Sequence, residues 1–199
     1  MSPSVFSAKP SVLRCSRCGK FVDWAEARLQ IVCGCRLHLD LPPVLTREAS
    51  PEDQAVAVEL FRRDFGRTSI ASFGHVIPLS EASTIVAEMK GDISGALAWK
   101  RRDDALQIVA LATDPMWQRS GVGAYLLAEA ELVARRTGAR RVVLATTNDN
   151  LPALYFYQRR GYRITEVVRD AWRDNAELTL GVGFADIPVR DELRLEKTL

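Results

Sequence analysis

Two glycines close together in the middle of the chain could bind a phosphate group. They lie in the run Gln118-Arg119-Ser120-Gly121-Val122-Gly123-Ala124, after an apolar stretch from Ile108 to Ala112 and before a helical pattern from Tyr125 to Arg136. The first backbone N–H groups of a helix have no partner inside the helix, and the helix dipole adds partial positive charge there. Glycine has no Cβ, so a phosphate can approach this backbone closely. The run therefore predicts binding of a phosphorylated cofactor.

A second set of residues with regular spacing follows the next predicted strand, as Asn150-x-x-Ala153-x-x-Phe156-Tyr157-x-x-x-Gly161-Tyr162. Together with Gln118-x-x-Gly121-x-Gly123, this segment resembles the two motifs of the GNAT family of N-acetyltransferases. The resemblance extends over roughly Pro43 to Leu199, and the order of predicted strands and helices agrees with that family throughout. Two motifs in the right order and at the right separation are a specific signal.

The resemblance implies that acetyl-CoA is the cosubstrate. Backbone N–H groups of Arg119 to Ala124 would hold its pyrophosphate, and Asn150 would contact the cofactor arm. In the family, the strand before the glycine loop bulges and separates from its neighbour. The freed backbone of Leu111, Ala112 and Thr113 would then pair with the amides of pantetheine, as a peptide adds to an open sheet edge. The implied reaction is direct transfer of the acetyl group, in a ternary complex, to a primary amine.

Tyr157 matches the tyrosine that protonates the leaving thiolate in the family, so we interpret it as the general acid. A thiol has a pKa of about 8.5, and its thiolate leaves more readily when it receives a proton. The alternative is that Tyr157 only packs under the sheet, as Tyr155 or Phe156 would. Its place in the motif favours the catalytic interpretation.

No residue is identified as the general base. Gln107 and Ala145 stand where histone-type and ribosomal-protein members of the family carry a glutamate, and neither side chain can accept a proton from an ammonium group. The remaining candidates are Glu88, Asp191 and Glu192, acting directly or through water, or the reaction uses no dedicated side chain as base. Thr146 and Thr147 could orient an acceptor, and His75 is predicted to lie in a loop with a surface or packing role. The missing carboxylates leave a second hypothesis open, a non-catalytic protein that senses acyl-CoA.

All four cysteines lie near the N-terminus, as Cys15-x-x-Cys18 and Cys33-x-Cys35. Four thiolates suit tetrahedral Zn(II), and this segment has too little apolar material to fold alone. The pattern resembles a zinc ribbon with one structural Zn(II) per chain, in which His38 could replace one cysteine of the second pair. Free thiols, or iron in place of zinc, are the alternatives. Such a module could bind a protein partner or mediate self-association.

Leu41-Pro42-Pro43 divides the chain into a zinc-ribbon-like module, residues 1–41, and an acetyltransferase domain, residues 42–199. In the second region, strands followed by strand–helix units predict an α/β (α+β) fold with a mixed central sheet flanked by helices. The predicted strands are 44–47, 84–89, 94–100, 105–113, 141–146, 162–168 and 191–196, and the predicted helices begin at Ser50, Tyr125 and Asn150. The family builds its acceptor pocket from variable segments, and the resemblance implies that these are Phe65 to Glu81 and the loop between Ala171 and Val189.

Composition limits the remaining possibilities. The chain has 199 residues, 47% of them hydrophobic, and a formal net charge of +2. This small charge gives no support for nucleic acid as a partner. No apolar run is long enough to span a bilayer, and the first fifteen residues lack a signal-peptide core. We therefore expect a cytoplasmic enzyme.

Overall fold

The computed structural model describes residues 12–14, 21–23, 44–171 and 183–199. The chain forms two compact units, Met1–Pro43 and Val44–Leu199. In the first unit, β1 (Val12–Arg14) and β2 (Phe21–Asp23) pair antiparallel as a short hairpin. The predicted metal ligands lie outside the described residues; these ligands are Cys15, Cys18, Cys33 and Cys35, with His38 as the alternative.

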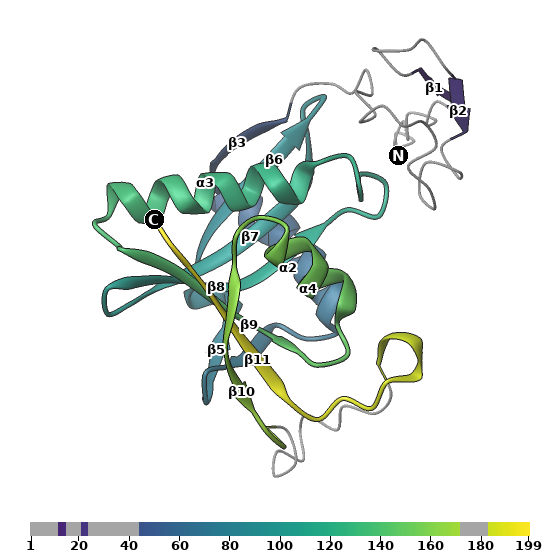
Figure 1. The fold of residues 1–199 in the computed structure, drawn as a ribbon. Coiled ribbons are helices and arrows are strands. Elements are labelled where there is room, and N and C mark those ends of the chain that lie inside the picture. The colour runs from purple at the N-terminus through teal and green to yellow at the C-terminus, as the bar shows by residue number, and fades with distance from the viewer. Residues whose placement is uncertain (1–11, 15–20, 24–43, 172–182) are drawn as a thin grey trace. The chain divides into compact units, whose positions relative to one another are not determined.

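A seven-stranded mixed sheet forms the centre of the second unit (Figure 1). In spatial order its strands are β10 (Arg163–Val168), β11 (Glu192–Thr198), β9 (Arg141–Thr147), β8 (Ala105–Thr113), β7 (Asp92–Arg102), β6 (Ser83–Met89) and β3 (Leu45–Glu48). Only β8 and β9 pair parallel; the other neighbours are antiparallel. The predicted mixed sheet is confirmed.

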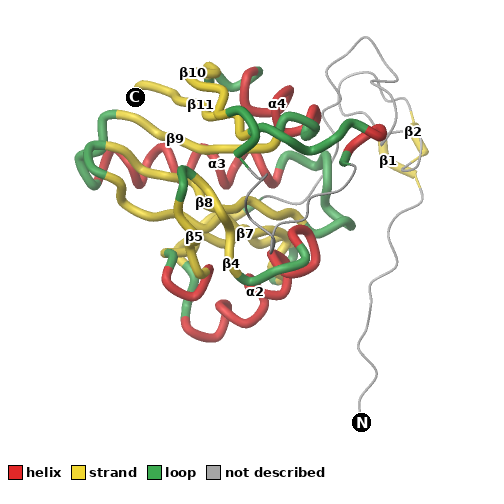
Figure 2. Tube along the Cα trace, turned by 90° about the horizontal axis from the view of Figure 1, so that it is seen from below, coloured by secondary structure: helices red, strands yellow, loops and turns green. Residues whose placement is uncertain are grey.

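Three helices accompany this sheet: α2 (Pro51–Phe65), α3 (Val122–Arg136) and α4 (Leu151–Gln158). Helix α2 packs on one face of β6, β7 and β8, and α3 packs on the other (Figure 2). Short 3-10 turns occur at Leu79–Glu81 and Phe184–Asp186. Ser50 caps α2 in a capping box with Asp53, and Pro51 is the first helical residue, as the sequence predicts.

Small and large side chains alternate in the core between α2 and the sheet. Ala57, Leu60 and Phe61 of the helix are buried against a layer that includes Ala96, Ala98 and Ala112 of the strands. Alanines on the strands let the helix lie close, and Phe61 fills the remaining volume. This packing fixes α2 against the strand that leads into the glycine loop.

The segment between α2 and β6 contains a hairpin that the sequence analysis missed. Here β4 (Ser69–Ser72) and β5 (His75–Pro78) pair antiparallel, where we predicted no strand and placed His75 in a loop. Phe73 and Gly74 form its two-residue turn with φ of 53° and 77°. Turns with two positive φ values match the twist of a hairpin, which explains the glycine.

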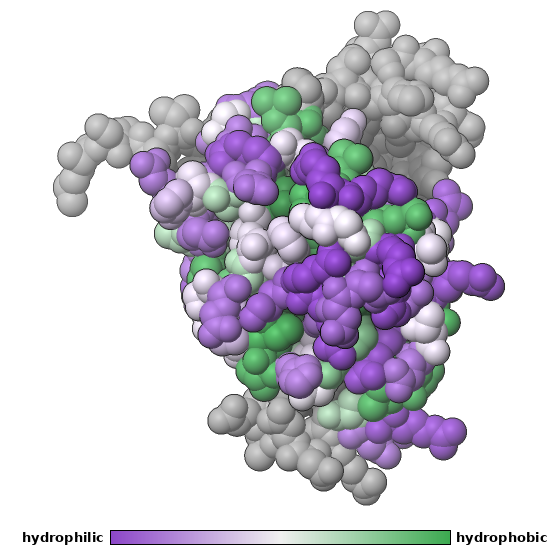
Figure 3. Space-filling view, turned by 90° about the vertical axis from the view of Figure 1, so that its left-hand side faces the viewer, coloured by the Kyte–Doolittle hydropathy of each residue, from purple (hydrophilic) through white to green (hydrophobic). Residues whose placement is uncertain are grey.

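Charged side chains cover much of the surface. The face in Figure 3 is mostly hydrophilic, with apolar residues in separate small areas. Several charges are paired, for example Arg141 with Asp104 at 3.0 Å and with Glu196 at 2.6 Å. No helix in the described part of the chain combines the length and apolar character needed to cross a membrane.

Candidate active site

Strands β8 and β9 separate from each other partway along their length. They pair only from Ala105 opposite Arg141 to Ile108 opposite Leu144, although β8 continues to Thr113 and β9 to Thr147. The separation begins at a β-bulge, because Trp99 of β7 pairs with Ile108 while Ala98 pairs with Ala110. Beyond the bulge, β8 pairs only with β7 among the strands that the structure describes, so its other edge is open there. This open edge includes Leu111, Ala112 and Thr113, the residues predicted to contact pantetheine.

The glycine loop ends this open edge and starts α3. Gly121 is the N-cap with φ 98°, and Arg119 also has a positive φ of 64°. The N–H groups of Gly121, Val122 and Gly123 have no acceptor within the described chain. These three donors at a helix N-terminus form an anion cradle of the predicted kind.

Side chains around the loop fix its shape. The carboxylate of Asp114 accepts a hydrogen bond from Met116 N at 2.7 Å, and Gln118 Nε2 lies 3.5 Å from the Thr113 carbonyl. Ser120 Oγ donates to the carbonyl of Trp117, and Ala124 N donates to the carbonyl of Gly121 at 2.8 Å. Of the loop residues predicted to bind the cofactor, Ser120 and Ala124 thus stabilise the turn, and Gly121 to Gly123 present the free donors.

Helix α3 and helix α4 meet at Gly123. A Cβ on this glycine would lie 3.5 Å from Leu111 Cδ2 and 3.5 Å from Phe156 Cζ, which is ordinary van der Waals contact. Asn150 begins α4, where its side chain accepts a hydrogen bond from Ala153 N at 3.2 Å. The cradle, the open edge of β8 and α4 therefore lie around one region.

Tyr157 is on the buried side of α4. Only 8% of the residue is exposed, and burial raises the pKa of its phenol above the ordinary value, with Arg160 acting in the opposite direction. Its ring packs edge-on against Phe156 and Tyr162, at centroid distances of 5.1 Å and 5.6 Å. A phenol in these surroundings stays protonated at neutral pH. Tyr155, by contrast, is 64% exposed, so of the two neighbours considered for packing under the sheet, Tyr155 and Phe156, Tyr155 does not.

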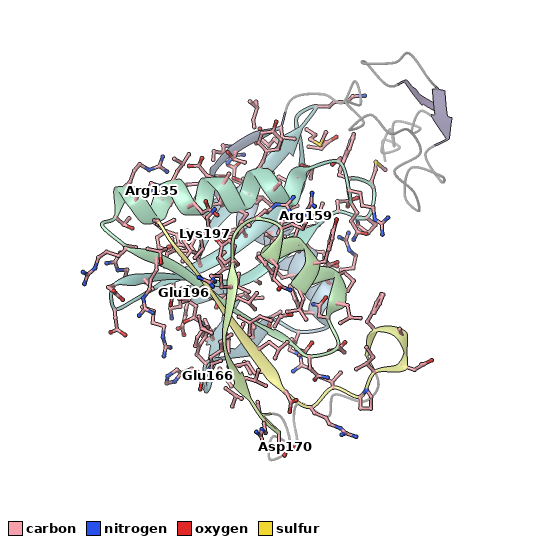
Figure 4. The ribbon with its side chains drawn as sticks, in the orientation of Figure 1. Arg135, Arg159, Glu166, Asp170, Glu196 and Lys197 are labelled. Carbon is pink, nitrogen blue, oxygen red and sulfur yellow. The ribbon has the colours of Figure 1, made fainter. Side chains whose placement is uncertain are left out.

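Tyr162 connects the aromatic cluster of Phe156, Tyr157 and Tyr162 to α3 and β11. Its hydroxyl donates to Glu131 Oε1 at 3.2 Å, and Lys197 Nζ donates to both oxygens of Glu131 at 2.8 Å and 2.7 Å. Lys197 lies on β11 beside α3, as Figure 4 shows. Burial and the charge of Glu131 both raise the pKa of Tyr162, so this hydroxyl also remains a donor.

Each carboxylate considered as a base has other partners. Glu88 bonds to Arg47 at 2.9 Å, Asp191 accepts from Asp170 N at 2.9 Å, and Glu192 accepts from Arg194 and Phe73. Gln107 is buried, and its Nε2 donates to Ser72 Oγ at 3.3 Å. The other predicted positions are Ala145, Thr146 and Thr147, all half-buried, and His75, which is exposed.

Sequence reasoning missed two residues at the end of β9. Asn148 Oδ1 accepts from Arg190 N and Asp191 N, and its Nδ2 donates to the Pro188 carbonyl. Asp149 is 7% exposed; its Oδ2 accepts from Phe184 N at 3.0 Å, and its Oδ1 has no partner among the described residues. Their position directly before the motif residue Asn150 was the available signal. Both hold the chain that leads into β11.

Among the described residues, no group of three or more histidine, cysteine, aspartate or glutamate side chains could hold a metal ion. The predicted cysteine ligands are not among these residues, so the zinc module stays a prediction.

The order of strands, the separation of β8 from β9 and the cradle at α3 together define the acyl-CoA N-acyltransferase fold. The family model described as the acetyltransferase (GNAT) family matches residues 51–162. The chain belongs to this family.

The chain is also similar to individual proteins. The protein YxbD of Bacillus subtilis is 39% identical over 113 residues, which cover 54% of this chain and 68% of YxbD. A B. subtilis acetyltransferase solved in complex with CoA has a similar fold, with a TM-score of 0.61 and 20% identity over 80% of this chain and 99% of that one. A GNAT acetyltransferase from Elizabethkingia anophelis with acetyl-CoA bound also has a TM-score of 0.61, with 20% identity over 78% of this chain and 98% of that one.

Proposed function

We propose that the unit Val44–Leu199 is an acetyl-CoA-dependent N-acetyltransferase that acts on a primary amine by direct transfer in a ternary complex. The observation that carries the proposal is the open edge of β8, which leads to three N–H groups that have no acceptor among the described residues. The edge suits the amides of pantetheine, and the donors suit a pyrophosphate. The relatives with bound CoA and acetyl-CoA support the same choice of ligand.

Acetyl-CoA supplies an acyl thioester when it is bound. Gly121, Val122 and Gly123 would hold the pyrophosphate, and Leu111, Ala112 and Thr113 would align the pantetheine arm along the gap between β8 and β9. Asn150 already uses Oδ1 to cap α4, so its Nδ2 is the group available to contact the cofactor. Tyr157 would donate its phenolic proton to the departing thiolate sulfur, since burial keeps that proton in place.

The acceptor must lose a proton before it attacks, because an alkyl ammonium has a pKa of about 10.4. We assign no side chain to this step, since Gln107 and Ala145 carry no carboxylate and Glu88, Asp191 and Glu192 are bonded elsewhere. The same observation favours a second candidate function, a protein that binds acyl-CoA without catalysis.

One experiment separates the two functions. Acetyl-CoA binding is measured by calorimetry, and thiol release from acetyl-CoA is followed with a panel of polyamines, amino acids, arylalkylamines and peptides with free N-termini. Saturable binding with amine-dependent thiol release supports the transferase. Saturable binding with no release above buffer for any amine supports the sensor, and absence of binding contradicts both.

For the N-terminal unit we propose one structural Zn(II) bound by Cys15, Cys18, Cys33 and Cys35. In the sequence the first pair falls between β1 and β2, and a Cys-x-x-Cys spacing suits a zinc knuckle. Such a module would serve a protein partner or self-association. Metal analysis of the purified protein tests it: one zinc per chain is expected, and a value well below one with no other metal contradicts it.

A further inference from the structure

Glu192 is a buried carboxylate at the start of β11, opposite Thr147 of β9. Only 2% of the residue is exposed, and each carboxylate oxygen has a partner. Oε1 accepts from Arg194 Nε at 2.7 Å, and Oε2 accepts from the backbone N–H of Phe73 at 3.2 Å. The second bond connects residues that are far apart in sequence and reaches the turn of the β4–β5 hairpin.

The turn of this hairpin is held from several strands at once. The guanidinium groups of Arg102 and Arg194 both lie over the ring of Phe73, with their carbons 4.9 Å and 4.8 Å from its centroid. The preceding residue, Ser72, accepts from Gln107 Nε2 on β8. In the sheet, β8 and β11 lie on either side of β9. Because the turn bonds to both β8 and β11, it crosses beneath the region where β8 and β9 separate.

The hairpin belongs to the face of the sheet that carries α2. Ile77 and Leu79 are buried in the same cluster as Leu60 and Phe61 of that helix, and Figure 2 places β4 and β5 on the α2 side. The anion cradle and Tyr157 belong to α3 and α4, which meet on the opposite face at Gly123. When the thioester is held in the gap between β8 and β9 from the α3 side, the amine approaches from the α2 side.

We propose that Glu192 is a positioning residue that locks the β4–β5 hairpin beneath the gap, where the hairpin forms the acceptor side of the active site, and that Glu192 is not the general base. Gln107 supports the same turn through Ser72. The role of the hairpin at the acceptor side rests on the proposed function. The bonds that hold its turn do not depend on that function. Gln107, which occupies the position of a missing base, and Glu192, a candidate base, thus both support the turn of the hairpin.

Two substitutions of Glu192 separate positioning from base catalysis. Glu192→Gln removes the basic group but keeps a carbonyl oxygen for Phe73 N–H, whereas Glu192→Ala removes both. Amide hydrogen exchange at Phe73, measured by NMR, is expected to accelerate about tenfold or more in Glu192→Ala and to stay much closer to wild type in Glu192→Gln. Glu166→Gln is the control, because Glu166 also bonds Arg194 but is exposed on β10 (Figure 4).

The second readout is the rate of thiol release from acetyl-CoA. It is measured with the amine of the panel that reacts fastest and, as the background, with water alone. We expect Glu192→Gln to keep kcat within about fivefold, since loss of a general base costs about a hundredfold or more. Glu192→Ala should raise KM for the amine and leave acetyl-CoA affinity unchanged. Ser72→Ala, which removes only the bond from Gln107, should also raise KM for the amine. This variant replaces Glu192→Ala in the test if Glu192→Ala does not fold.

Two results would overturn the proposal. One is a hundredfold fall in kcat for Glu192→Gln with exchange at Phe73 unchanged, which makes Glu192 the base. The other is wild-type exchange at Phe73 in Glu192→Ala. Because amide exchange needs no substrate, failure of the proposed transferase is seen separately, as a wild-type protein that releases no thiol above buffer with any amine.

Discussion

Gly95 of β7 lies directly beneath Val122, the first residue of α3. A Cβ on Gly95 would be 2.8 Å from Val122 Cγ1, 3.0 Å from the carbonyl oxygen of Ala112 and 3.1 Å from Leu126 Cδ1. Gly95 pairs with Thr113 at the end of β8, so this close approach occurs next to the open edge. Because Gly95 has no side chain, the N-terminus of α3 and its anion cradle can lie close to the sheet.

Replacing Gly95 should disturb both stability and cofactor binding. Gly95→Ala forces Val122 or the Ala112 backbone to move, and overpacking of this kind costs about 1–3 kcal/mol. Denaturant unfolding measures the loss, and calorimetry should show weaker acetyl-CoA binding. Gly123→Ala is the control for stability, because its Cβ meets Leu111 and Phe156 at ordinary contact distance. Equal unfolding free energies for the two variants would contradict this account.

The two loop glycines should respond differently to alanine. Gly121 has φ 98°, a conformation that costs an L-residue about 1–2 kcal/mol, whereas Gly123 has no such requirement. Gly121→Ala is expected to weaken acetyl-CoA binding about tenfold, since the free N–H groups reorient when the turn relaxes. Gly123→Ala should bind nearly as wild type, and a bulky residue at Gly123 should abolish binding. Similar affinities for both alanine variants would show that the positive φ is not needed.

The sequence predicted the sheet because local signals and long-range packing agree there. The strand Ala105–Thr113 has the predicted bounds, and α2 begins at the predicted residue, Ser50, which caps it. Helix α3 begins at Val122 rather than Tyr125, since its first turn contains the glycines that reduce the helical signal. Terminal strand residues differ by one or two positions, as at β11, which runs from Glu192 to Thr198.

The acceptor side of the site could not be predicted in the same way. The β4–β5 hairpin depends on bonds from Gln107 and Glu192, which are far away in sequence. Its local signal, alternating residues around Phe73-Gly74, was present but weak. Gln107 looked like a vacant catalytic position because spacing alone does not reveal that its amide bonds to Ser72.

Tyr157→Phe should lower turnover and leave cofactor binding nearly unchanged. The substitution removes only the hydroxyl from a ring that packs against Phe156 and Tyr162. Loss of a general acid costs about a hundredfold or more in kcat. Thiol release and calorimetry measure the two effects, and Tyr155→Phe is the control because that side chain is exposed on the same helix. Full activity in Tyr157→Phe would make the role of Tyr157 one of packing.

The rate should rise with pH without a decline caused by Tyr157. Burial raises the pKa of this phenol, so the folded state favours its neutral form. The contribution to stability is fully present below the unfolded pKa of about 10 and is lost as the pH rises above it. Between pH 6 and pH 9 we expect kcat to increase as the amine deprotonates. A falling limb in this range that disappears in Tyr157→Phe would show that Tyr157 ionises earlier.

Stability in acid should depend on Asp53, which joins the cap of α2 to β3. Arg47 Nη1 bonds its carboxylate at 2.5 Å and Ser50 N bonds it at 2.6 Å, and these contacts hold the pKa of Asp53 well below its ordinary value. A lowered folded pKa stabilises the protein above the unfolded value of about 3.9, and this stabilisation is lost as the pH falls below it. Asp53→Asn should therefore be less stable than wild type at pH 7, and the difference should shrink toward pH 3. Unfolding curves at both pH values measure it, with Glu52→Gln, the exposed neighbour in the same turn, as the control. A difference that is the same at both pH values would mean that the charge of Asp53 contributes nothing.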